Sequence, residues 1–163
     1  MDVFLVPMKR FTSFVMVFAC VLLLYGCRNN IDSLIWVHSN GEVSKPYENF
    51  IWAQNWSEHG WLSADGMSIA LEFSNIHNEI PQINYGEDFE IHYNDGVEFV
   101  SLSVYSQDFE RIHHNVEEQV LNDLASGTYY LVINVRSQGE YIEAEEKYEY
   151  SGYECVYQIM ITE

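Results

Sequence analysis

The sequence predicts an all-β domain with the architecture of a sandwich or a barrel. Apolar residues recur with a period of two, which is the period at which side chains alternate between the faces of a strand. Turn sequences that tolerate a positive φ separate the alternating segments, at Asn40-Gly41, Asp65-Gly66 and Asn94-Asp95-Gly96. Strands that follow one another at intervals of about ten residues, with turns between them, are typical of these two architectures.

The alternation is clearest over residues 128–136, and it continues over 153–161 and 97–105. On residues 128–136 both faces are apolar enough to indicate cover on both sides. Residues 116–124 are predicted to form either a helix, because apolar residues recur there at every fourth position, or a strand that enters a corner. Shorter strands are expected over 34–38, 50–56, 68–73 and 89–93.

A corner motif precedes the most regular of these strands. Leu124, Gly127 and Tyr129 form the pattern Leu-x-x-Gly-x-Tyr, which resembles the tyrosine corner of immunoglobulin-like sandwiches. In that corner the tyrosine hydroxyl bonds back to the nearby backbone. The resemblance implies an immunoglobulin-like sandwich of about seven to nine strands, without the inter-sheet disulfide of antibody domains. It also implies that the last two strands form a hairpin, joined by a long loop over residues 137–152.

The N-terminal segment is predicted to be a signal peptide outside the fold. Lys9 and Arg10 precede an apolar run over residues 11–26. A positive flank before a short apolar segment is the pattern of a secretion signal, and a membrane-spanning helix needs roughly 20 residues. Translation can start at Met1 or at Met8, and Met8 lies directly before the basic pair. An uncleaved signal anchor is the alternative interpretation.

The end of this segment resembles the lipobox of bacterial lipoprotein precursors. Leu24, Gly26 and Cys27 match the motif, whereas Tyr25 stands where a small or β-branched residue is usual. The resemblance implies a diacylglyceryl group on the sulfur of Cys27 and cleavage just before it. The expected organisation is a signal peptide (1–26), a lipidated cysteine with a short tether (27–33) and a β-domain (34–163). The expected location is the extracytoplasmic face of the cell membrane.

Several parts of the β-domain also resemble a set of uncharacterised lipoproteins from Gram-positive bacteria: residues 46–48, Trp61, Asp65-Gly66, residues 127–130 and residues 150–157. This resemblance implies the anchor and the fold.

The charge of the predicted mature chain excludes one class of partner. Without the signal, the chain keeps 24 of 25 acidic residues and five of seven Lys and Arg residues, which gives a net charge of −19. Such a chain is repelled by nucleic acid, so we expect no nucleic-acid partner. Its many aromatic and β-branched residues argue against disorder.

The cysteines and histidines indicate neither a disulfide nor a metal site. If Cys27 carries lipid, Cys155 is the only other cysteine of the mature chain, and its alternating strand predicts a small buried hydrophobe rather than a reactive thiol. His113 and His114 are adjacent and would point to opposite faces of a strand. No zinc-ligand spacing and no nucleophile motif is present. We therefore expect no enzyme activity, no metal and no cofactor.

The strongest candidates for binding are tyrosines and glutamates in the predicted long loop. Tyrosine among flexible polar residues suits protein recognition, because it offers a large contact area at low entropy cost. Crowded carboxylates can also bind Ca²⁺, but the spacing of a known calcium loop is absent. Trp61 follows Gly60 and is expected in an exposed loop, whereas Trp52 and Trp56 are expected in the core. The candidate contact residues are Trp61, Tyr141, Glu143, Glu145, Glu146, Tyr148 and Tyr150.

These features predict a non-catalytic interaction or sensor module that is anchored to the membrane through lipid on Cys27 and contacts a basic protein partner. The alternative is a small-ligand or Ca²⁺-binding surface protein that assists a transporter or a cell-wall enzyme.

Overall fold

The computed structural model describes residues 32–162, so the predicted signal peptide and Cys27 lie outside the described residues. The prediction of a mostly β domain is confirmed. Ten strands are described, more than the seven to nine expected: β1 (Ile35–Ser39), β2 (Glu42–Ser44), β3 (Tyr47–Ser57), β4 (Gly60–Asp65), β5 (Gln82–Asn84), β6 (Glu90–Tyr93), β7 (Val97–Ser106), β8 (Arg111–Val116), β9 (Gly127–Ile142) and β10 (Lys147–Ile161).

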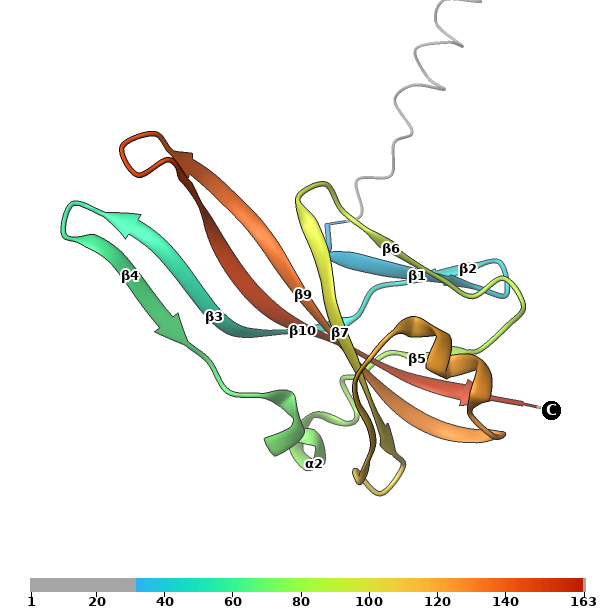
Figure 1. The fold of residues 1–163 in the computed structure, drawn as a ribbon. Helices are drawn as coiled ribbons and strands as arrows, with labels where there is room; N and C mark the ends of the chain where they lie inside the picture. Colours follow the sequence, from blue (N-terminus) through green and yellow to red (C-terminus); the bar gives the residue numbers. More distant parts are fainter. Residues whose placement is uncertain (1–31, 163) are drawn as a thin grey trace, which may run out of the picture. The chain divides into compact units, whose positions relative to one another are not determined.

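The strands form a large curled sheet and a small one (Figure 1). Six antiparallel strands in the order β4-β3-β10-β9-β7-β8 make a half-barrel, and β5 adds to it by pairing in parallel with β10. The small sheet has the order β2-β1-β6. Its β1–β2 turn is formed by Asn40 and Gly41, which both have a positive φ, as the turn sequence predicts.

One core lies between the two sheets. Side chains of β9 and β10 that alternate along each strand point into it, together with side chains of β1 and β6. Its buried members include Ile35, Val37, Ile91, Leu131, Ile133, Val135, Cys155, Tyr157 and Ile159. This burial is the physical cause of the alternation on which the strand predictions rest.

A second, smaller core lies on the opposite face of β9 and β10. A 3₁₀ helix η1 (Ile69–Leu71) and a short helix α2 (Phe73–Ile76) cover this face. Ile69, Phe73 and Ile76 pack there against Tyr130, Val132 and Val156. The predicted cover on both faces of this strand is therefore confirmed.

The predicted corner bond is present. The hydroxyl of Tyr129 donates a hydrogen bond of 3.0 Å to the carbonyl oxygen of Ala125 at the start of β9. The segment before it forms a 3₁₀ helix, η2 (Glu118–Asp123), so the helical alternative holds for residues 118–123, whereas Val116 is the last residue of β8.

The predictions for two whole segments are wrong. Residues 68–73 form η1 and the start of α2 rather than a strand, because Ile69 and Phe73, four residues apart, both reach the second core. Residues 137–152 are not a loop: β9 extends to Ile142, β10 begins at Lys147, and only residues 143–146 connect them. This part of the hairpin projects beyond the core, and few of its side chains are buried. Its two strands nevertheless pair with each other through the main chain.

Candidate functional site

The end of the β9–β10 hairpin gathers five of the seven candidate residues. Tyr141 and Tyr148 are register partners, and their ring centroids lie 4.8 Å apart. The two tyrosines are 48 % and 41 % exposed. Glu143, Glu145 and Glu146 form the turn between them, and Glu146 takes a left-handed φ of 53°. We call residues 141–148 the hairpin tip. It presents two contacting aromatic rings beside three carboxylates.

Tyr150 does not belong to this tip. A bulge in the pairing of β9 and β10 separates it from Tyr148, and its side chain is half-buried. The guanidinium carbon of Arg136 lies 4.7 Å from the centroid of its ring, in cation–π geometry. Arg136 also forms an ion pair with Glu98. The ring of Tyr150 therefore already packs against Arg136 of the same chain.

Trp61 lies in strand β4, so its predicted loop position is wrong. The turn before it consists of Glu58 and His59 alone, because Ser57 and Gly60 already pair. Trp61 is half-buried and meets its register partner Trp56 edge to face, at a centroid distance of 5.5 Å. Its indole nitrogen is buried and, among the described residues, makes no hydrogen bond.

The β3–β4 and β9–β10 hairpins run side by side (Figure 1). Their main-chain pairing ends at Gln54 and Tyr150, and beyond this point Glu149 accepts a hydrogen bond of 2.7 Å from the backbone N–H of Trp56. We call residues 52–65 and 137–152 the arm. Seven acidic residues and one lysine lie in it, so its field is strongly negative.

A cleft of about 600 Å³ lies on the face of the large sheet that η1 partly covers. Arg111, Arg136 and His114 line it together with the exposed apolar side chains of Leu71 and Val100. The two arginines are half of the four Lys and Arg residues between positions 32 and 162. The sequence gives no signal for this cleft, because its lining comes from five strands that only the fold brings together.

Glu154 in the cleft wall is a structural carboxylate. It is 7 % exposed and accepts hydrogen bonds from the backbone N–H of Ile69 (2.6 Å), the hydroxyl of Ser68 (2.8 Å) and the amide of Asn49 (3.2 Å). These bonds hold the start of η1 against the sheet. They also satisfy the buried charge, which would otherwise destabilise the fold.

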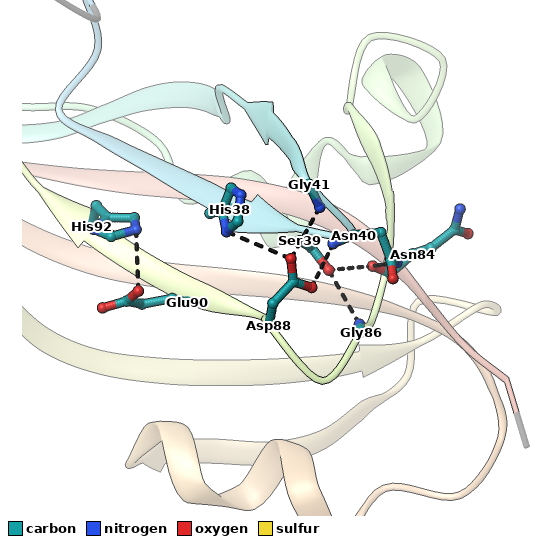
Figure 2. Close-up of polar contacts among 9 residues, drawn as sticks. All are labelled: His38, Ser39, Asn40, Gly41, Asn84, Gly86, Asp88, Glu90 and His92. Carbon is teal, nitrogen blue, oxygen red and sulfur yellow. Dashed lines mark hydrogen bonds and ion pairs between the residues drawn. The ribbon is translucent and has the colours of Figure 1, made fainter.

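A second polar cluster surrounds the β1–β2 turn (Figure 2). The carboxylate of Asp88 accepts hydrogen bonds from the backbone N–H groups of Asn40 (2.6 Å) and Gly41 (3.0 Å). These two bonds lower the pKa of Asp88. Nearby, the hydroxyl of Ser39 donates to the carbonyl oxygen of Asn84 at 2.6 Å. These three hydrogen bonds, each with a main-chain group, clamp the turn to the end of β5 and to the segment between β5 and β6.

Neither a metal centre nor a reactive thiol is found in the described part of the chain. Within residues 32–162, no three His, Cys, Asp or Glu side chains converge to hold a metal ion. Cys155 is fully buried between the sheets, and burial raises the pKa of its thiol. The prediction that Cys155 is a small buried hydrophobe is confirmed.

Comparisons with family models, with curated proteins and with solved structures find no match for this chain. Among residues 32–162, no helix is long and apolar enough to span a bilayer.

Proposed function

We propose that the protein is a lipid-anchored, extracytoplasmic lipoprotein whose β-domain is a non-catalytic interaction or sensor module for a basic protein partner. The lipobox resemblance at Cys27 supports the anchor. The observation that carries the interaction is the exposed Tyr141–Tyr148 pair beside the three glutamates of the hairpin tip.

The physical chemistry of the tip suits recognition of a protein. The two rings are held against each other across paired strands, so little side-chain entropy is lost when a partner covers them. Glu143, Glu145 and Glu146 add negative charge, which speeds association with a basic surface and disfavours an acidic one. The tip also lies at the end of a projecting hairpin (Figure 1), where a large partner can reach it.

The immunoglobulin-like assignment belongs to the same proposal. It is supported by the hydrogen bond of Tyr129 to Ala125 at the corner and by a core enclosed between two sheets.

Cross-linking in cells tests the interaction. The tagged full-length protein is cross-linked, and its partners are identified by mass spectrometry. The tip variant carries Tyr141→Ser, Tyr148→Ser, Glu143→Gln, Glu145→Gln and Glu146→Gln, and we expect it to lose the partner cross-links of the wild type. The matched control neutralises three exposed glutamates elsewhere, Glu42, Glu87 and Glu110, and should keep them. Unchanged cross-links in the tip variant would contradict the proposal.

The cleft favours a second candidate function, the binding of a small ligand for a transporter or wall enzyme. Arg111 and Arg136 both line this cleft of an acidic domain, Arg136 in its ion pair with Glu98, and Leu71 and Val100 add exposed apolar side chains. These groups suit a small carboxylate with an apolar body. Such ligands should raise the melting temperature of the wild type, because they bind the folded state, and they should raise it less in Arg111→Gln. The absence of any shift across a panel of such carboxylates would exclude this function.

Titration with Ca²⁺ tests the cation version of the alternative. A rise in melting temperature that disappears when Glu143, Glu145 and Glu146 are replaced by Gln would place a Ca²⁺ site at the tip. No rise for the wild type would exclude it.

A further inference from the structure

Strand β4 forms one edge of the large sheet, and in the described part of the chain its only strand partner is β3. Natural edge strands are usually protected by a charge, a proline, a bulge or a very short length. In β4, all six residues pair with β3 without a bulge, the strand has no proline, and Asp65 at its end is its single charged residue. The edge of β4 is therefore open to another strand.

The other edge of the same sheet differs. Strand β8 pairs with β7 through two register shifts and carries Arg111, and Asn115 within it has a left-handed φ of 52°. In the small sheet, the edge strand β2 has three residues and β6 has four. These edges are interrupted or short, so β4 is the best template for strand addition among the edges that residues 32–162 provide.

The register shows which main-chain groups of β4 are available. The backbone N–H of Gly66, directly after β4, donates to the carbonyl oxygen of Ile51. Because hydrogen bonding alternates along an antiparallel strand, Leu62 and Ala64 also direct their N–H and C=O groups toward β3. The corresponding groups of Trp61, Ser63 and Asp65 then point away from β3.

The side chains and the charge of the arm indicate what kind of strand fits. Leu62 is 53 % exposed and can contact apolar side chains of an added strand. The arm as a whole carries seven acidic residues and one lysine, so it favours a positively charged segment. A second copy of this chain would bring the same negative arm against its own, which is unfavourable.

We propose that β4 is a docking edge where an extended, basic segment of a partner protein adds to the large sheet as a further strand. The inference rests on the proposed function and deepens it, because it names the way in which the basic partner binds. Main-chain hydrogen bonds to Trp61, Ser63 and Asp65 supply affinity, and the acidic arm selects the charge.

Hydrogen exchange, measured amide by amide on the full chain, tests this docking. The probe is a short peptide of alternating lysine and valine residues, added across the micromolar to millimolar range. We expect it to slow exchange at Trp61, Ser63 and Asp65 by about tenfold or more, since these amides gain partners. The amides of Leu62 and Ala64 should change little, because they are already bonded to β3.

Two changes isolate the main-chain contacts. Ser63→Pro removes the central outward N–H, which an edge strand tolerates on its solvent side, and should abolish the protection at Trp61 and Asp65. Slow exchange at Leu62 and Ala64 would show that the variant hairpin is intact, and Ser63→Ala is the matched control that keeps the amide. The same peptide with an N-methylated backbone cannot donate main-chain hydrogen bonds and should give no protection to the wild type. This test does not depend on whether the proline variant folds.

Each contrary result overturns a defined part of the proposal. No protection by the lysine–valine peptide at any concentration refutes docking at β4, and equal protection by a glutamate–valine peptide refutes selection by charge. If exchange at Trp61, Ser63 and Asp65 slows with rising protein concentration in the absence of peptide, a second copy of this chain occupies the edge and the basic partner is refuted. If cellular cross-links depend on the tip while β4 stays unprotected, the docking edge fails and the proposed function stands. If the peptide protects β4 while the tip variant keeps its cross-links, the docking edge stands and the proposed role of the tip fails.

Discussion

Trp52 on β3 lies over Gly152, its register partner on β10, and a Cβ atom at position 152 would lie 2.1 Å from the indole nitrogen of Trp52. Glycine is required here by this close approach. We predict that Gly152→Ala lowers the free energy of unfolding by about 1–3 kcal/mol, because the ring or the strand must shift. Urea denaturation measures the change. In a Trp52→Ala background the same substitution should cost less, and an equal cost would contradict this explanation.

The corner bond of Tyr129 predicts a small loss of stability in Tyr129→Phe. Removing the hydroxyl leaves the ring but deletes the hydrogen bond to the carbonyl oxygen of Ala125. We expect the free energy of unfolding to fall by about 1 kcal/mol, because the bond is partly accessible to water. Tyr148→Phe is the control, since that side chain is 41 % exposed, and it should change stability less. Equal stabilities for wild type and Tyr129→Phe would show that the bond contributes nothing.

Asp88 predicts an acid-dependent loss of stability. The N–H groups of Asn40 and Gly41 lower the pKa of Asp88 below its ordinary value of 3.8. The pKa of Asp88 is lower in the folded state than in the unfolded state, so the ionised carboxylate stabilises the fold at a pH above its unfolded-state pKa. This stabilisation is lost as the pH falls through its folded-state pKa. The melting temperature should therefore fall more steeply below about pH 4 in the wild type than in Asp88→Asn. Glu87→Gln, at an exposed neighbouring acid, should behave like the wild type, and parallel curves for all three proteins would contradict the prediction.

Cys155 is predicted to react with thiol reagents only when the domain unfolds. It is fully buried and burial raises the pKa of its thiol, so both access and the thiolate form are suppressed at neutral pH. Labelling is measured in a chain in which Cys20 and Cys27 are replaced by Ser, first without and then with denaturant. A cysteine placed at the exposed position Ala144 is the fast-reacting control. Rapid labelling of Cys155 in the native state would show that the core opens readily.

The predictions from sequence succeed where burial and local geometry act together. Alternation identifies β7, β9 and β10 because one or both of their faces are buried, so each second side chain must be apolar. The Leu-x-x-Gly-x-Tyr pattern predicts the bond of Tyr129 because donor and acceptor are only four residues apart.

The failures come from hairpin segments whose strands are paired although few of their side chains are buried. Residues 137–152 are predicted to be a loop because their glutamates break the apolar alternation, yet both strands continue through them by main-chain pairing. Trp61 is predicted to be exposed because it follows a glycine, yet it pairs with Trp56 across a turn of only two residues. Hydrophobic patterns report burial, and in these segments pairing rather than burial maintains the strands.

The sequence by itself determined the mostly β architecture, the burial of Cys155, the corner at Tyr129 and the acidic charge, because these follow from local spacing and composition. Only the tertiary structure decided that Tyr141 and Tyr148 face each other at a projecting tip, that Arg111 and Arg136 line one cleft, and that β4 forms an open edge. Strand order and register join residues that are far apart in the chain, and no local pattern records which strands become neighbours.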